Sequence, residues 1–166
     1  MLGEDHKYSE LEITQNPALG AYALWKFGLG HQERNSDPAP LSLAFLVLPM
    51  VLHAKTLISL SSTWESSGLG KFVQKMSENR EELLAIHGRA LAMRSLSLNS
   101  IVIGNSRKLL TPSYEIATIR ATSPHLFSKA KVPERLKKIG PASRKLGVWF
   151  SQLDTVQLVR ILNVSL

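Results

Sequence analysis

Residues 41–54 read LSLAFLVLPMVLHA and are apolar on almost every side of any regular structure they form. The length of this segment and its leucines favour a buried helix over a strand. Pro49 lies inside it, and a proline removes one backbone hydrogen bond and clashes with the preceding turn. The pattern therefore predicts a core helix that kinks or restarts at Pro49, covered by the rest of the chain or by a partner subunit.

The residues before this segment predict another helix. Asn16 is a favourable N-cap and Pro17 suits the first helical position, so the helix is expected to begin there. Apolar residues then recur at helical spacing, and Gly28 and Gly30 predict the end of the helix. Residues 1–15 are polar and acidic, which predicts a flexible N-terminal arm.

Further helices are predicted after the core segment. Helical spacing covers residues 64–76, 81–94 and 97–107, with Ser95 or Ser97 as the expected cap of the third. Two short strand-like runs around residues 109–120 then flank the turn sequence Pro112-Ser113-Tyr114, which predicts a β-hairpin.

The basic C-terminal region, residues 133–163, is predicted to be helical. Pro133 is the expected start of a helix that Gly140-Pro141 must kink or split, and Asp154 is the expected cap of the last one. The whole pattern predicts a mainly α fold with a small β-hairpin, arranged as a single helical domain over residues 16–166 that is winged-helix-like.

Three helices followed by a hairpin is the order of a winged helix, and this order suggests one possible function. The helix over residues 97–107 would be the recognition helix of a stand-alone DNA-binding transcriptional regulator. Its expected exposed residues are Asn99, Ser100, Asn105, Arg107 and Lys108. Because only Arg107 and Lys108 are cationic, a module that docks on protein is at least as plausible as one that reads a DNA groove.

Composition excludes several classes of protein. The chain has 166 residues and no cysteine, so it has no disulfide scaffold, thiol nucleophile or Cys-ligated zinc site. The longest apolar run has about a dozen residues, fewer than the roughly 20 that a membrane helix needs. The first residues are mixed and acidic, with no basic stretch followed by an apolar one, so no secretion signal is expected. We therefore expect a soluble cytoplasmic protein without a membrane partner.

Support for catalysis is weak. None of the five histidines forms an i, i+4 metal pair, and there is neither a phosphate-binding P-loop nor a G-x-S-x-G nucleophile elbow. Adjacent Glu81 and Glu82 point in different directions on a helix, which makes them a poor acid–base pair. An enzyme would need a pocket lined by His53 or His87. We therefore expect no enzymatic activity, no cofactor and no metal site.

Charge is concentrated in residues 129–145, which carry seven cations against the single acid Glu134 and so account for nearly all of the net charge of +7. Such a segment is a solvated helix face, a docking surface for an acidic protein, or a phosphate-binding surface for double-stranded DNA. The candidate contact residues are Lys129, Lys131, Arg135, Lys137, Lys138, Arg144 and Lys145. Aromatic residues dominate cores and interfaces, so Trp25, Phe45, Trp64 and Trp149 are the expected core or interface anchors.

Several segments, in order, resemble one family. They are NPALGAY (16–22), LAFLVLPMVLH (43–53), HGRALAM (87–93), KLGVWFSQL (145–153) and LNV (162–164). Together they resemble the middle component of three-component ABC (ABC-3C) systems, and the chain is similar to the small accessory subunit of Lamassu-type bacterial defence complexes. Pro141 and the acidic arm before Asn16 depart from the pattern, which leaves open which face meets which partner.

The resemblance implies a role and no reaction. In such anti-phage or anti-plasmid complexes an SMC-like ABC ATPase, expected as a dimer, senses DNA and hydrolyses ATP, and a third subunit carries an effector domain that is often a nuclease. The middle component is implied to be a non-catalytic bridge that holds the ATPase heads and the effector together and assists DNA sensing.

Overall fold

The computed structural model describes residues 15–122 and 132–165. The main helices are α2 Pro17–Gln32, α3 Leu41–Val51, α4 Ala54–Ser62, α5 Gly68–Ser77, α6 Arg80–Ala92, α7 Arg94–Ser106, α8 Ile139–Ser151 and α9 Thr155–Leu162. Two 3₁₀ turns, Glu65–Ser67 and Glu134–Leu136, precede α5 and α8. The predicted mainly helical fold with a small β element is confirmed as a single compact domain. The predicted arm, apart from Gln15, lies outside the described residues.

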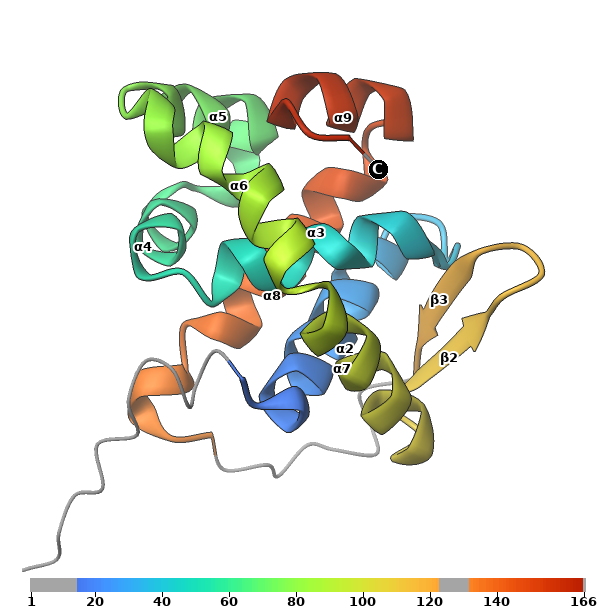
Figure 1. Cartoon of the computed structure of the whole chain (residues 1–166). Helices are drawn as coiled ribbons and strands as arrows, with labels where there is room; N and C mark the ends of the chain where they lie inside the picture. The colour runs from blue at the N-terminus through green and yellow to red at the C-terminus, as the bar shows by residue number, and fades with distance from the viewer. Residues whose placement is uncertain (1–14, 123–131, 166) are drawn as a thin grey trace, which may run out of the picture.

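Helix α3 forms the centre of the core, as its sequence predicts. Most of its residues are buried, and Figure 1 shows it crossing the middle of the molecule among α2, α6, α7 and α8. Pro49 lies in the last turn of α3, and the chain bends by 100° between α3 and α4. The predicted break comes at Leu52, three residues after Pro49. Pro49 has no N–H to donate to the preceding turn, but the loss of this one hydrogen bond does not end the helix at the proline.

Helix α2 does not end at Gly28 or Gly30, so that prediction was wrong. The helix continues to Gln32 because both glycines are used for close packing. A Cβ on Gly30 would lie 2.0 Å from the Arg144 carbonyl oxygen of α8. On the other side of this crossing, a Cβ on Gly147 would lie 2.1 Å from the Phe27 carbonyl oxygen. The two helices thus meet backbone to backbone.

The predicted hairpin is confirmed as part of a three-stranded antiparallel sheet. Strands β2 Leu110–Ser113 and β3 Thr118–Ala121 pair with Thr111 opposite Arg120. Strand β1 Ala39–Pro40 pairs with β3, which gives the order β1-β3-β2. The sequence pattern did not predict β1, because two residues are too short to show an alternation. The winged-helix assignment is not confirmed and stays a prediction.

Helix boundaries in the second half differ from the expected ones at two places. Helix α7 begins at Arg94, so Ser95 and Ser97 lie inside it and do not cap it. The predicted helix from Pro133 is divided into the 3₁₀ turn Glu134–Leu136 and α8, which begins at Ile139, just before Gly140-Pro141. Pro141 thus stands in the first turn of α8, where a missing N–H is tolerated.

The last helix begins where the sequence predicts. The Gln157 N–H donates to Asp154 Oδ1 over 2.7 Å, and the Asp154 N–H donates to Gln157 Oε1 over 3.0 Å. These reciprocal bonds form a capping box that fixes the start of α9.

Within the described residues, no single helix has the length and apolarity to cross a membrane. Helices α3 and α4 reach that length and apolarity only when taken together, and they are bent by 100°.

Candidate functional site

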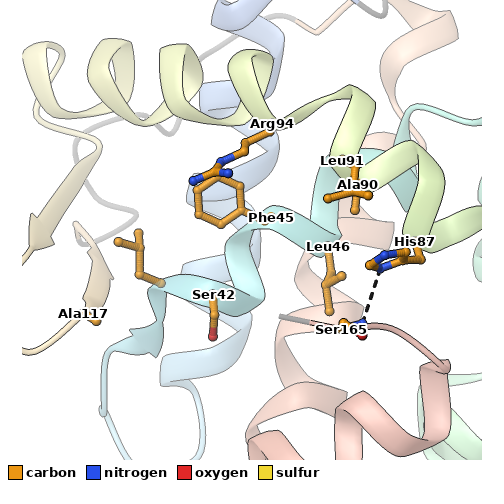
Figure 2. Close-up of a pocket in the computed structure, with 10 residues that line it drawn as sticks. Ser42, Phe45, Leu46, His87, Ala90, Leu91, Arg94, Ala117 and Ser165 are labelled. Atoms are coloured by element: carbon orange, nitrogen blue, oxygen red, sulfur yellow. Dashed lines mark hydrogen bonds between the residues drawn. The ribbon is translucent and has the colours of Figure 1, made fainter.

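A groove opens beside α3, where the α6–α7 elbow, the hairpin turn and the C-terminal residues meet. Its volume is about 380 Å³. Figure 2 shows its walls converging from these four elements, although they are far apart in the sequence. The lining residues are Leu41, Ser42, Phe45, Leu46, His87, Ala90, Leu91, Arg94, Ala117 and Ser165.

The groove is apolar with a cationic rim. Leu91 is 62% exposed, which is unusual for a leucine, and Phe45 forms part of the wall on α3. Figure 2 shows Phe45 on α3 and Arg94 at the start of α7 among the side chains that line the groove. No aspartate or glutamate lines the groove, and among the ion pairs of residues 15–122 and 132–165 none involves Arg94. The rim therefore offers a guanidinium to a partner.

The apolar surface continues beyond the groove along α7. Leu98 and Val102 follow Arg94 by four and eight residues, so the three side chains lie on one face of the helix. Both Leu98 and Val102 are exposed. An exposed apolar stripe that continues from a groove is typical of a protein–protein contact surface.

A polar cluster fixes α6 against the α3–α4 elbow. The Arg89 Nε–H donates to the Pro49 carbonyl over 3.2 Å, and Arg89 Nη2 donates to Thr56 Oγ1 over 3.1 Å. This guanidinium therefore satisfies a carbonyl at the C-terminal end of α3, where orphan acceptors occur. Burial lowers the pKa of Arg89 below its ordinary value, against the opposing attraction of Glu82.

Glu82 is the acid of this cluster. Lys55 Nζ donates to Glu82 Oε1 over 3.1 Å, and this bond is the main reason why the pKa of Glu82 lies below its ordinary value. Glu82 Oε2 is 3.6 Å from Arg89 Nη1 and 3.7 Å from His53 Nδ1. These distances are too long for hydrogen bonds, so Oε2 stays without a bonding partner within the described residues.

His87 lines the groove at its junction with the C-terminus. Its Nδ1 accepts a hydrogen bond from the Ser165 N–H over 3.3 Å (Figure 2). The other histidine singled out by the sequence, His53, lies in the polar cluster and within 3.1 Å of Thr56 Oγ1. The two therefore do not line one common pocket. Within the described residues, no group of three His, Cys, Asp or Glu side chains is placed to hold a metal ion.

A second apolar site lies on the residues that follow α4. Trp64 is 81% exposed, and Ile58 on α4 is also exposed. Tryptophan is the residue type most enriched at binding hot spots, and so large an exposed ring is unusual in a folded chain. Residues 63–65, here called the Trp64 loop, share no residue with the groove.

Helix α8 holds the Trp64 loop from both sides of the tryptophan. Lys145 Nζ donates to the Leu60 and Thr63 carbonyls over 2.8 and 2.7 Å. The Trp149 indole N–H donates to the Glu65 carbonyl over 2.8 Å. Because the backbone on each side of Trp64 is fixed, the exposed ring is preorganised for a partner at a small entropic cost.

Arg144 adds a charged clamp to the same loop. Its Nε and Nη2 contact both Glu33 carboxylate oxygens over 2.5 and 2.7 Å, and its Nη1 contacts Glu65 Oε2 over 2.7 Å. The hydrogen bonds that Arg144 donates to Glu33 and Glu65 raise its pKa, against the effect of partial burial. The charges of Arg144 and Lys145 are thus used inside the chain.

The other predicted basic contacts differ in position. Lys137 and Lys138 are exposed just before α8, and Lys137 pairs with Glu134. Arg135 lies in the 3₁₀ turn Glu134–Leu136. Lys129 and Lys131 lie outside the described residues. Lys137 and Lys138 are thus at the surface of the described structure, and the role of all seven residues in DNA or protein binding stays a prediction.

The four aromatic anchors divide into two pairs. Trp25 and Trp149 are buried, and their indole N–H groups donate to the Thr122 and Glu65 carbonyls. Phe45 is half-buried in the groove wall and Trp64 is exposed. The first pair therefore belongs to the core, whereas the second pair marks the two surface sites.

The predicted recognition helix is only partly available at the surface. Asn99, Asn105, Arg107 and Lys108 are exposed as expected. Ser100 is fully buried and its hydroxyl donates to the Leu96 carbonyl over 2.7 Å, so its predicted exposure was wrong. The physical reason is its contact with α2, where it faces Gly20.

Sequence reasoning missed the groove and the exposure of Trp64. The groove depends on contacts between residues more than 70 positions apart, such as His87 and Ser165, and no local pattern encodes these. A signal for Trp64 was present, because this residue follows a break at Ser61-Ser62-Thr63 and precedes the polar sequence Glu65-Ser66-Ser67. A tryptophan within such a polar stretch has few neighbours in sequence that could bury it.

One family model matches the chain over residues 5–166, and it describes the ABC-three component (ABC-3C) system Middle Component 3. The match covers both surface sites and the whole described fold. Neither a curated protein nor a solved structure matches the chain.

Proposed function

The chain belongs to the Middle Component 3 family of ABC three-component systems, and from this premise we propose that it is a non-catalytic bridging subunit. It would hold an SMC-like ABC ATPase and an effector subunit, often a nuclease, in one Lamassu-type complex that acts against phages or plasmids. Membership of the family implies an ABC ATPase and a further component as partners. The bridging role and the relation to Lamassu are our proposal.

One observation carries the proposal, namely the presence of two separate apolar surfaces. The groove is built by α3, α6, α7 and the hairpin turn, whereas the Trp64 loop is held by α8. In Figure 1, α4, which leads to this loop, lies at one end of α3, and the hairpin lies beside the other end. Two partners can therefore bind at the same time, as a bridge requires.

Assistance with DNA sensing is the second part of the proposal. Its support is the net charge of +7 and the exposed Lys137 and Lys138 before α8. Lysines on a surface neutralise phosphates without reading base sequence, so they would add affinity to a complex whose ATPase engages the duplex.

Co-expression of the chain with the other two components of its system tests the bridge. We expect a ternary complex that one tagged component purifies intact, and a chain that behaves poorly alone because of its exposed apolar surfaces. Leu91→Asp should release one component and Trp64→Ser the other. Val156→Ser, which removes an exposed apolar side chain on α9, is the matched control.

Retention of both components by both variants would contradict the two-surface bridge. A chain that binds neither component but selects a DNA sequence as a dimer would favour a winged-helix regulator instead.

A further inference from the structure

We infer that the groove receives an amphipathic helix from one of the other two components, with apolar residues in the groove and a carboxylate on Arg94. This inference rests on the proposed function and names the kind of partner that one of the two surfaces fits. It is carried by the shape of the apolar surface and by the charge of its rim.

The extent of the apolar surface favours a helix over a small molecule. From Arg94 to Val102 the exposed face of α7 extends about 12 Å along the helix axis, at roughly 1.5 Å per residue. The apolar surface is longer than the groove by this stretch. A small molecule would fill the groove and leave Leu98 and Val102 exposed. A helix with apolar residues at i, i+3 or i+4 and i+7 covers both parts, which is how helices dock in grooves.

The lining also favours side-chain packing over strand addition. The sheet contributes only Ala117 to the groove, from the turn between β2 and β3. The rest of the wall consists mainly of side chains on α3, α6 and α7. A partner strand would find no ladder of backbone groups along such a wall, whereas a helix needs only apolar contacts.

Charge complementarity is the reason why we expect a carboxylate on the partner helix. Arg94 is exposed at the rim, and among the described residues that line the groove there is no aspartate or glutamate, while His87 is a second titratable group. An aspartate or glutamate at the edge of the helix would pair with the guanidinium, and its desolvation by the docked helix would strengthen the pair. The same rim disfavours a basic helix, so it also selects the partner.

Site-specific crosslinking in the assembled complex tests the occupant. Benzoylphenylalanine replaces Ala90, a small residue of the groove wall, and mass spectrometry identifies the peptide that it captures. The expected peptide belongs to one other component, is helical and carries apolar residues at helical spacing beside an acid. Capture of residues 1–14 of this chain, of a second copy, of a non-helical peptide, or of nothing would each overturn the inference.

A charge swap tests the ion pair. Arg94→Glu should weaken binding of the captured component by about tenfold, since removal of a partly desolvated charge pair at an interface has effects of this size or larger. Exchange of the captured acid for arginine should restore binding. Arg107→Glu, at an exposed cation at the end of the same helix, is the matched control and should leave binding unchanged.

The outcomes separate this inference from the proposed function. If the wild-type chain binds neither component, the bridge itself is wrong. If the complex forms and Arg94→Glu leaves it intact while the variant unfolds at the wild-type temperature, the bridge stands and the acidic helix in the groove is refuted.

Discussion

Cations close together in the sequence can have different roles, and those in and just before α8 provide an example. Arg144 bonds to Glu33 and Glu65, whereas Lys138, just before the helix, is exposed to solvent. A basic segment in a sequence therefore does not by itself mark a binding surface. The partners of each side chain decide whether its charge is available to another molecule.

Arg144→Gln is expected to lower the free energy of unfolding by about 1 kcal/mol, because the pairs with Glu33 and Glu65 are partly exposed and solvent screens them. Loss of the clamp should also loosen the Trp64 loop and weaken the partner that binds there. Urea unfolding measures the first effect and the affinity of the assembled complex the second. Lys137→Gln is the control, and an equal loss for both variants would contradict a special role for Arg144.

Ser97 is buried in α7 and its hydroxyl has no hydrogen-bond partner within the described residues. Ser97→Ala removes that unsatisfied group and adds helix propensity, so it is expected to raise the free energy of unfolding by about 1 kcal/mol. Thermal unfolding provides the measurement. Ser100→Ala is the contrast, since that hydroxyl donates to the Leu96 carbonyl. A loss of stability for Ser97→Ala would show that its hydroxyl is bonded in solution.

The lowered pKa of Glu82 predicts that the free energy of unfolding decreases in acid. Its pKa is lowered in the folded chain, mainly by the hydrogen bond from Lys55, so the unfolded chain takes up the proton more readily. The stabilisation is complete above the ordinary carboxyl pKa and is lost as the pH falls through the lowered pKa. Glu82→Gln should therefore be less stable than wild type near neutral pH, by about 1 kcal/mol, and the difference should shrink in acid.

Urea unfolding of both proteins between about pH 7 and about pH 3 checks this expectation. Glu81→Gln is the matched control, because Glu81 is an exposed neighbour on the same helix. A difference between Glu82→Gln and wild type that grows as the pH falls would contradict the sign of the effect.

At the scale of elements, the close crossing of α2 and α8 depends on glycines, which have no side chain to separate the two helices. Gly147→Ala would place a Cβ 2.1 Å from the Phe27 carbonyl oxygen, a position that no rotamer change relieves. We expect the helices to separate at a cost of about 3 kcal/mol, the upper range for overpacking. Gly88→Ala is the control on α6, where no atom lies within 4 Å of the added Cβ, and it should add about 1 kcal/mol. Chemical denaturation compares the two, and equal effects would contradict the close crossing.

Elements with a local chemical signal were predictable from the sequence. The Asn16 side chain caps α2, the Asp154 side chain caps α9, and apolar content identified α3 as a core helix. Gly30 was misread, since a glycine that ends a helix and one that lets a second helix approach look alike in sequence. What distinguishes them is Arg144 on α8, more than 100 residues away.

The candidate site was less predictable than the fold. Phe45, Trp64, Trp25 and Trp149 were all singled out as core or interface anchors, and nothing local distinguishes the first two, at the surface, from the last two in the core. Whether an aromatic ring is covered depends on the packing of the complete chain. The same holds for Arg144, because Glu33 and Glu65 come near it only after α2 and the 3₁₀ turn have packed on α8.

At the scale of the whole molecule, some basic side chains form bonds within the chain, which leaves fewer of them available to an anionic partner. Arg144 and Lys145 hold the Trp64 loop, so reversal of these charges would disturb the fold and the apolar site together. Lys137 and Lys138 are exposed, and Lys137 pairs with the exposed Glu134, so we expect changes at both lysines to leave the fold and the Trp64 loop intact. They therefore allow a test of DNA binding that leaves assembly intact.

Lys137→Glu combined with Lys138→Glu is expected to weaken double-stranded DNA binding by the assembled complex without impairing its assembly. If both lysines contact phosphates, the slope of log affinity against log salt should fall by about 2, since each contact contributes about 0.9. Fluorescence anisotropy with a labelled duplex at several salt concentrations measures that slope. Lys145→Glu is the contrast, because it should destabilise the chain through loss of the bonds to Leu60 and Thr63. An unchanged slope for the double variant would assign DNA sensing to the other components and leave this chain with the bridging role alone.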